Sequence, residues 1–400
     1  MRVLHVVASV DERMGGSTRA PLTIAEHLRR FGVESHVAAT TQPTDALGYL
    51  GVEYPEVHVH LFPTTLPKHN FRSPQLHSWL RKHARSFDLV DIHGVWSFPP
   101  LYAGIQASRA NRPYLVRPHG SLEPYDIQKH YWQKRVYGRI VVKPWLQRSA
   151  GMLLATRREA QCAVSYGASP RRHVVPLPAQ FVESHGGNGS RFRARYGIPS
   201  DAFVVLFLGR IDEKKGLQFL VPALESLIRE IPAVWLAVVG NGDAKFQTTI
   251  KDLISRGPLA ERATWCGFLS GDEKASAYSA ANIFALPSLN ENFGITVLEA
   301  VHARVPILIS NEVYVHDAIT SADAGIICSP TADSVTRAIR FAWMHRGGLK
   351  DMAERATQVV RVEFSPDSAT RRLVNVYECA TQIARPGPSY PNTSKAQERS

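Results

Sequence analysis

Short apolar runs recur along this chain of 400 residues, and a helical pattern follows most of them. They lie at residues 2–10, 87–96, 114–116, 204–209 and 234–243. Continuous runs rich in Val, Ile and Leu are typical of strands that a parallel sheet buries on both faces. Strands that alternate with helices in this way predict an α/β fold built from doubly wound parallel sheets.

The length of the chain predicts two domains, since single hydrophobic cores stop growing at about 250–300 residues. A polar, glycine-rich stretch at residues 182–199 is the predicted linker. It divides the chain into a domain of residues 1–182 and a second domain of residues 183–364. The segment 386–400 is rich in Pro and Ser and nearly lacks apolar side chains, so we expect a disordered tail.

The positive charge of the chain is concentrated in its first part. Residues 1–180 hold 23 Lys and Arg against 12 Asp and Glu, a net charge of +11, whereas the whole chain has +12. A basic half suits an anionic membrane surface or an anionic acceptor molecule. Nucleic acid would suit it equally on electrostatics alone.

Cysteine usage and hydropathy indicate a cytoplasmic protein. Cys162, Cys266, Cys328 and Cys379 are far apart and form no C-x-x-C pair, which favours reduced thiols over disulfides or a zinc site. No run approaches the roughly 20 apolar residues of a membrane span. The first residues become polar too soon for a signal peptide and are typical of a buried strand.

The stretch at residues 287–300 reads PSLNENFGITVLEA and contains two carboxylates, Glu291 and Glu299, with seven residues between them. A turn at residues 290–294 that opens a helix would present backbone N–H groups and the positive end of the helix dipole to a ligand. The two carboxylates could accept hydrogen bonds from vicinal hydroxyls, which indicates carbohydrate chemistry. The alternative is a solvated helix face with a chance pair of glutamates.

This stretch resembles the E-x7-E signature of the retaining GT-B glycosyltransferases, in particular family 4 (glycosyl transferases group 1). The resemblance includes Pro-Ser before Glu291, Phe-Gly after it, Glu299-Ala300, and the following run VPILIS. It implies a GT-B fold, in which two Rossmann-like doubly wound domains face an interdomain cleft. It also implies retaining transfer of a hexosyl group from a nucleotide diphosphate sugar. Glu291 would bind sugar hydroxyls near the reacting carbon, and Glu299 would hold the nucleotide ribose.

Two cations follow the buried run that ends in Gly209, namely Arg210 and Lys215. Charge builds on a pyrophosphate leaving group as the glycosidic bond breaks, and two cations on one turn can stabilise it. The spacing resembles the G-R…K-G motif of the family, which assigns both side chains to the diphosphate; Lys214 is interpreted as a solvated neighbour. Because these cations would do the electrostatic work of a divalent ion, we expect no metal and no cofactor besides the nucleotide sugar.

Histidines follow two strands of the first predicted domain. His119 lies in a His-Gly pair after residues 114–116 and resembles the family histidine that contacts the transferred sugar. His93 and Trp96 follow the preceding strand, and ligands of open α/β sheets lie outside the carboxyl ends of strands. We therefore predict that His93 and Trp96 contact the acceptor, although a packed histidine is an alternative for His93.

Further donor contacts come from loops that resemble those of the family. A glycine pair after the first strand would face the diphosphate, and the loop after residues 263–267 would cradle the nucleobase. One departure is Pro176-Leu177-Pro178, where relatives commonly have Pro-Asn-Gly. Residues 365–385 resemble the closing helix that returns to the first domain. The predicted loop contacts are Gly15, Gly16, Gly209, Gly267, Phe268, Asn292, Phe293 and Gly294.

Residues 129–148 contain six Lys or Arg, four aromatic residues and no acid. One interpretation is a solvated helix face. The other is an amphipathic segment that docks on anionic headgroups at the inner face of a membrane, where Trp and Tyr are favoured beside cations.

Together these patterns predict hexosyl transfer to a saccharide or a lipid-linked saccharide, as in polysaccharide or cell-envelope glycan biosynthesis. A GT-B nucleotide-sugar epimerase or phosphorylase is the alternative enzyme. A basic nucleic-acid-binding protein is the remote alternative, because it leaves Glu291 and Glu299 without a role; we expect no nucleic-acid partner.

Overall fold

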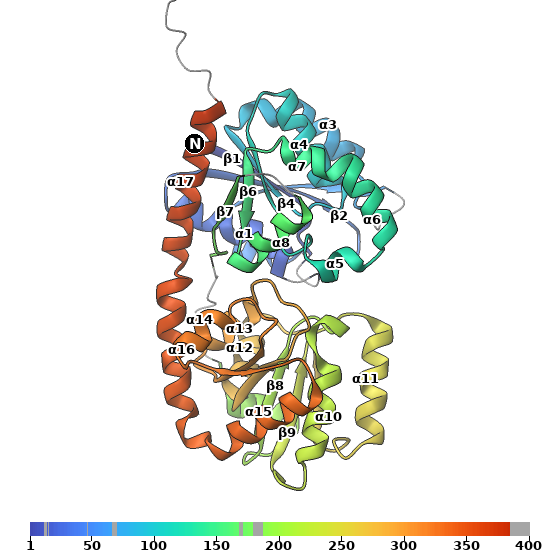
Figure 1. Ribbon diagram of the computed structural model, residues 1–400, viewed down its shortest axis with the longest axis vertical. Coiled ribbons are helices and arrows are strands. Elements are labelled where there is room, and N and C mark those ends of the chain that lie inside the picture. The colour runs from blue at the N-terminus through green and yellow to red at the C-terminus, as the bar shows by residue number, and fades with distance from the viewer. Residues whose placement is uncertain are drawn as a thin grey trace, which may run out of the picture.

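Two parallel sheets, one in each half of the chain, form the frame of the molecule (Figure 1). The computed structural model describes residues 1–11, 14, 16–45, 47–65, 70–167, 171–178 and 187–384. Within these residues, the paired strands of both sheets are parallel. The α/β prediction made from the apolar runs is therefore confirmed.

The N-terminal sheet has seven strands in the order β3-β2-β1-β4-β5-β6-β7. The order reverses between β1 and β4, and ligands of such sheets bind at the carboxyl ends of the strands beside that point. The strands are β1 (Arg2–Ser9), β2 (Glu34–Thr41), β3 (His58–Pro63), β4 (Leu89–His93), β5 (Tyr114–Arg117), β6 (Gly151–Leu154) and β7 (Arg172–Val174).

Helices connect and cover these strands, and their starts follow ordinary capping chemistry. Ser73 accepts a hydrogen bond from the Leu76 amide, and Thr156 accepts one from the Glu159 amide. The helices are α1 (Gly16–Arg29), α2 (Leu50–Glu53), α3 (Pro74–His83), η3 (Ala84–Ser86), α4 (Phe98–Arg109), α5 (Pro124–Gln128), α6 (Tyr131–Tyr137), the π-helix η4 (Gly138–Val142), α7 (Lys143–Gln147) and α8 (Arg157–Tyr166).

The C-terminal sheet has six strands in the order β10-β9-β8-β11-β12-β13, and its order reverses between β8 and β11. Every side chain of β8 is buried, as the continuous apolar run predicts. The strands are β8 (Phe203–Leu208), β9 (Val234–Val239), β10 (Ala263–Gly267), β11 (Ile283–Leu286), β12 (Ile307–Ser310) and β13 (Ile326–Cys328).

Helices connect the strands of this domain, and η5 and α13 follow the two strands at the reversal point. The turn before η5 and the loop before α13 therefore meet at one edge of the sheet. The helices are α9 (Gly189–Arg195), η5 (Glu213–Lys215), α10 (Leu217–Leu227), α11 (Ala244–Arg256), α12 (Gly271–Ala280), α13 (Ile295–His302), α14 (His316–Ser321), α15 (Ala332–Met344), η6 (Arg346–Gly348) and α16 (Leu349–Glu363).

The last helix, α17 (Pro366–Ala384), returns to the N-terminal domain and lies along one side of the molecule (Figure 1). It packs against α1 and β4. The Tyr377 hydroxyl on α17 donates a hydrogen bond of 2.5 Å to the Asp91 Oδ2 on β4, and both residues are fully buried. This helix occupies nearly the whole of the segment 365–385 that resembles a closing helix.

The predicted linker is wrong from residue 189 onward, because α9 forms there and packs on α12. The Asn188 side chain caps α9, and Phe192 is buried. Arg193 reaches the Ala280 carbonyl at the end of α12. The preceding residues 179–186 and the predicted tail at 386–400 lie outside the described residues.

Candidate active site between the domains

A cavity of about 320 Å³ lies between the two domains, at the carboxyl ends of their strands. Its volume is within the range typical of small-molecule sites. Both domains contribute to its wall, with His119 and Pro178 on one side and the loop before α13 on the other. The predicted site residues in the wall are Gly16, His119, Gly209, Arg210, Lys215, Phe268, Glu291, Asn292, Phe293, Gly294 and Glu299. Gly15 lies outside the described residues.

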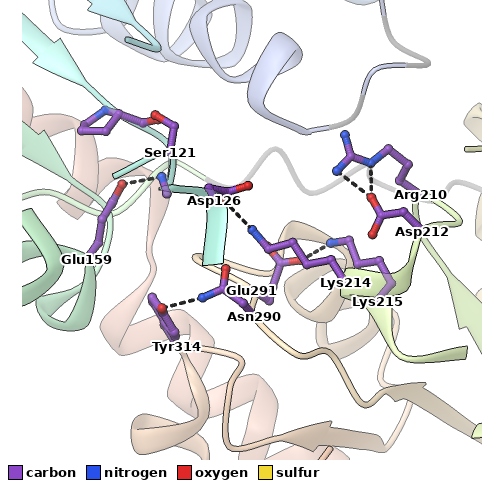
Figure 2. Close-up of polar contacts among 12 residues, drawn as sticks. Ser121, Asp126, Glu159, Arg210, Asp212, Lys214, Lys215, Asn290, Glu291 and Tyr314 are labelled. Atoms are coloured by element: carbon purple, nitrogen blue, oxygen red, sulfur yellow. Dashed lines mark hydrogen bonds and ion pairs between the residues drawn. The ribbon is translucent and has the colours of Figure 1, made fainter. Parts of the chain in front are cut away.

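Glu291 pairs with Lys215 across the cavity edge (Figure 2). The Glu291 Oε1 also accepts a hydrogen bond of 3.3 Å from the amide of Gly294, which has a φ of 69° and is the N-cap residue of α13. Burial alone would raise the pKa of Glu291, but Lys215 and then Lys214 lower it by more, so the net shift is downward. Glu291 is therefore held as a carboxylate that faces the cavity.

Glu299 lies on α13, the helix that follows the Glu291 loop, and has two partners on α12. Its Oε1 accepts from the Lys274 Nζ at 2.7 Å, and its Oε2 accepts from the Tyr278 hydroxyl at 2.9 Å. Burial, and then the Glu299 charge, raise the pKa of Tyr278 well above its usual value, so Tyr278 stays a donor. These partners fix the carboxylate in one orientation. Sequence reasoning missed both, because a lone Lys and Tyr on a helix carry no motif.

Arg210 follows β8 and pairs with Asp212 on the same turn, at 2.7 Å between its Nη2 and the carboxylate Oδ2 (Figure 2). Its side chain is 47% exposed, whereas that of Lys215 is 17% exposed. The two predicted cations thus lie on one turn beside the cavity, and each has a carboxylate partner. The arrangement offers two positive groups on the same wall as Glu291.

The interpretation of Lys214 as a solvated neighbour is wrong. Its side chain is 14% exposed, and its Nζ lies 2.9 Å from the Oδ2 of Asp126 on α5 of the other domain (Figure 2). Its Nζ also lies 5.4 Å from the ring centroid of Tyr125. The 3-10 turn of η5 directs Lys214 toward the N-terminal domain and Lys215 toward Glu291. Lys214 therefore links the two domains at the cavity.

His119 has a φ of 54°, and its Nε2 lies 2.9 Å from the Nδ1 of His93. His93 is 2% exposed and lies behind His119, so the predicted direct contact of His93 with an acceptor is not supported. Trp96 donates its indole N–H to the Ser121 carbonyl at 2.8 Å. His93 and Trp96 are not among the described residues that line the cavity.

Several loops approach the cavity closely because they contain glycine. A Cβ on Gly216 would lie 2.0 Å from the Pro287 carbonyl oxygen, and one on Gly240 would lie 1.9 Å from that of Gly209. A side chain at Gly216 would push the loop after β8 away from the loop before α13, and one at Gly240 would push the loop after β9 away from the loop after β8. Gly267 has a φ of 71° and ends β10, and the next residue, Phe268, reaches the cavity wall.

The segment Pro176-Leu177-Pro178 reaches the cavity from the N-terminal domain. Leu177 is 5% exposed, and both Leu177 and Pro178 line the wall. In place of the Asn-Gly pair expected from the resemblance, this chain therefore presents an apolar surface with no side-chain amide.

Two doubly wound domains that face each other across a cavity define the GT-B fold class. The structure of HepE from Anabaena in complex with UDP and glucose superposes with a TM-score of 0.79 at 17% sequence identity, covering 95% of this chain and 100% of HepE. This likeness confirms the predicted GT-B fold.

Comparison with protein families identifies the family to which the chain belongs. The model "Glycosyl transferases group 1" matches residues 189–359, and "Glycosyltransferase Family 4" matches residues 14–179. The chain belongs to this group of glycosyltransferases, and the predicted family is confirmed.

Similar curated proteins match over part of their length. A D-inositol 3-phosphate glycosyltransferase of Kineococcus radiotolerans is 33% identical over 255 residues, which are 60% of this chain and 57% of that protein. An uncharacterized glycosyltransferase of Methanocaldococcus jannaschii is 28% identical over 193 residues, 48% of this chain and 49% of that protein. The chain thus spans about half of the length of these relatives.

Proposed function

We propose that this protein is a retaining glycosyltransferase that moves a hexosyl group from a nucleotide diphosphate sugar to a saccharide or lipid-linked acceptor. The observation that carries the proposal is the Lys215–Glu291 pair on the wall of the interdomain cavity. It brings a cation suited to a diphosphate next to a carboxylate suited to sugar hydroxyls. The solved relative with UDP and glucose supports a donor of this type.

In this proposal the donor lies along the C-terminal wall of the cavity. Lys215 and Arg210 exchange their carboxylate partners for the diphosphate oxygens and stabilise the negative charge that develops as the glycosidic bond breaks. Glu291 accepts hydrogen bonds from the sugar hydroxyls. Glu299, oriented by Lys274 and Tyr278, accepts hydrogen bonds from the ribose hydroxyls. His119 contacts the transferred sugar from the opposite domain.

We propose that transfer needs neither a metal ion nor another cofactor. The argument is electrostatic: Arg210 and Lys215 supply two positive charges at the place where a divalent ion would act on a leaving diphosphate. Comparing glycosyl transfer with and without a chelator tests the metal independence separately from the transfer activity.

The acceptor we propose is anionic or lipid-linked, as in polysaccharide or cell-envelope glycan assembly. The N-terminal part of the chain carries nearly all of the excess positive charge. One relative is a D-inositol 3-phosphate glycosyltransferase, and D-inositol 3-phosphate is an anionic molecule. Among the described residues, Arg19 and Lys214 add cations to the cavity wall besides the two assigned to the donor.

A membrane surface is the proposed site of action, and the patch that would dock consists of Trp132, Arg135, Val136, Arg139 and Ile140. The three apolar side chains are 72%, 57% and 69% exposed, and their spacing of four places them on one helical face. The Arg135 guanidinium lies 5.9 Å from the Trp132 ring centroid. No helix in the described part of the chain is long and apolar enough to cross a bilayer.

Binding to anionic vesicles tests this patch. We expect the affinity for phosphatidylglycerol vesicles, measured by sedimentation, to fall at least tenfold when Arg135 and Arg139 are both changed to Glu. Each cation near such a surface contributes about 1 kcal/mol to binding. The matched control changes the exposed Arg256 and Arg361 of the other domain to Glu. Equal binding of the patch variant and the control would contradict the proposal.

Donor turnover tests the function. We expect release of a nucleoside diphosphate from one member of a panel of UDP-, GDP- and ADP-hexoses, dependent on an added glycan acceptor and unchanged by chelator. NMR of the product anomer then tests retention. A donor converted without any acceptor, or consumed by phosphate, would instead identify an epimerase or a phosphorylase. Family membership disfavours the nucleic-acid-binding alternative.

A further inference from the structure

A row of three histidines runs from the cavity into the N-terminal sheet. His119 follows β5, His93 ends β4, and His5 lies in β1, and these strands are consecutive in the sheet. The His119 Nε2 is 2.9 Å from the His93 Nδ1, and the His93 Nε2 is 3.3 Å from the His5 Nδ1. Only His119 reaches the cavity wall, so the row connects a ligand-facing imidazole with the core.

A buried carboxylate stands beside the inner end of this row. The Asp91 Oδ2 lies 3.7 Å from the His5 Nδ1 and 3.8 Å from the His93 Nε2, and all three side chains are inaccessible to solvent. The Tyr377 hydroxyl of α17 donates to the same oxygen at 2.5 Å. The Asp91 charge is therefore fixed in place by the helix that returns from the second domain.

The three imidazoles are neutral, so each carries one N–H. Burial holds the pKa of His5 at about 4. Burial, then the adjacent imidazole and the Arg117 guanidinium, hold the pKa values of His93 and His119 well below their usual value. In a row of neutral imidazoles, the position of one proton determines the positions of the others.

The surroundings of His5 determine where that first proton lies. The His5 Nε2 is buried and has no hydrogen-bond partner among the described residues. A proton there would be an orphaned buried donor, which is rare in proteins, whereas a proton on Nδ1 faces the Asp91 carboxylate. His5 then donates from Nδ1 to His93, and His93 donates from its own Nδ1 to the Nε2 of His119. The single proton of His119 is left on Nδ1.

We propose that His5, His93 and Asp91 form a proton-ordering row that fixes His119 as a neutral Nδ1–H donor toward the ligand in the cavity. Among the described residues, none occupies the Nδ1 of His119 with a hydrogen bond, so this N–H is available to a ligand oxygen. His93 and His5 are positioning residues, since they act through His119. The ligand, an oxygen of the transferred sugar, rests on the function proposed above; the position of the proton does not.

A metal ion is the competing occupant of the same cluster, because His5, Asp91 and His93 each offer one ligand atom within 4.8 Å of the others. A divalent cation would add two positive charges beside Arg117, which is 1% exposed. Even with Glu159, whose carboxylate also interacts with Arg117, two carboxylates cannot balance three positive charges, and uncompensated buried charge is costly. The charges therefore favour a row of protons over a metal.

The decisive measurement is the position of the His119 proton in the full-length protein. We expect 15N NMR of histidine-labelled wild-type protein to show a protonated Nδ1 and an unprotonated Nε2 for His119, assigned by the signals lost in His119→Asn. Asparagine suits this position because it tolerates a positive φ. A proton on the Nε2 of His119 would overturn the proposal. Stoichiometric zinc binding that shifts the signals of His5 and His93 would also overturn it.

Two variants of His93 separate proton ordering from packing. His93→Asn keeps a side-chain N–H near the position of Nδ1, whereas His93→Leu keeps the apolar volume and removes the donor. We expect the Leu variant to lower kcat about tenfold or more with a smaller change in KM and to shift the His119 proton, and the Asn variant to restore both. Wild-type kcat and proton position in the Leu variant would overturn the proposal. If neither variant folds, or if no sugar is transferred, the wild-type spectrum still decides.

Discussion

Changing Lys215 to Ala is expected to lower kcat for glycosyl transfer by about 100- to 1000-fold, with a smaller change in KM for the donor. This is the usual cost of removing one preorganised group that stabilises charge in a transition state. Lys215 is 17% exposed and lies beside Glu291, so little water is available to replace it. Because the charge on the diphosphate grows during bond breaking, the loss appears mainly in kcat. Steady-state kinetics with saturating acceptor measures both constants.

The matched control is Lys245→Ala, which removes the same charge from an exposed position on α11. It should leave kcat within about twofold. A melting curve of each variant checks that Lys215→Ala is folded, because the change also removes the partner that lowers the pKa of Glu291. Transfer at more than a third of the wild-type kcat by folded Lys215→Ala would exclude the assigned role.

The fold could be predicted from the sequence because its signal is repeated. Each buried parallel strand requires a continuous apolar run, and the runs at β4 and β8 are buried along their whole length. The stretch from residue 287 to 300 could be assigned for a related reason. A turn followed by a helix places Glu291 and Glu299 by local geometry alone, so the chain between them determines their separation.

Contacts between distant segments could not be predicted in this way. Lys214 and Lys215 are adjacent and chemically identical, yet one pairs with Asp126 of the other domain and the other pairs with Glu291. The direction of each side chain depends on how the two domains meet, and the partner Asp126 is 88 residues away. No local sequence pattern predicts a contact between residues that are so far apart in the chain.

The histidines show the limit of the strand-end rule. The rule places His93 and His119 at the same edge of the sheet, and the structure brings their rings to a centroid distance of 5.2 Å. The rule does not predict which of the two side chains reaches the cavity. His119 follows β5 with a positive φ that turns it to the cavity, while His93 still belongs to β4 and stays 2% exposed.

Glu123 is expected to give the protein a strong pH dependence of stability. It precedes α5 in the N-terminal domain and is fully buried, and neither carboxylate oxygen accepts a hydrogen bond of ordinary geometry from the described residues. Burial raises its pKa to about 8, although Lys214 of the other domain lowers it in part. In the folded protein Glu123 is therefore neutral at pH 7, whereas in the unfolded chain it is ionised.

The sign of the effect follows from proton linkage. Between about pH 4.5 and pH 8 the folded state binds one more proton than the unfolded state, so the free energy of unfolding falls as the pH rises through this window. Glu123→Gln keeps the shape of the neutral side chain and cannot ionise. It should match the wild type below about pH 4.5 and be more stable at pH 8.5, by up to about 5 kcal/mol when the shift is converted at 1.36 kcal/mol per pKa unit.

Denaturant unfolding of both proteins at several pH values measures this difference. The control is Glu261→Gln, which removes an exposed carboxylate of the other domain and should leave the difference from wild type flat with pH. A constant difference for Glu123→Gln would show that Glu123 is ionised in the folded protein. Its carboxylate would then need a partner, and Lys214, the cation that lowers the pKa of Glu123, could move from Asp126 to meet it.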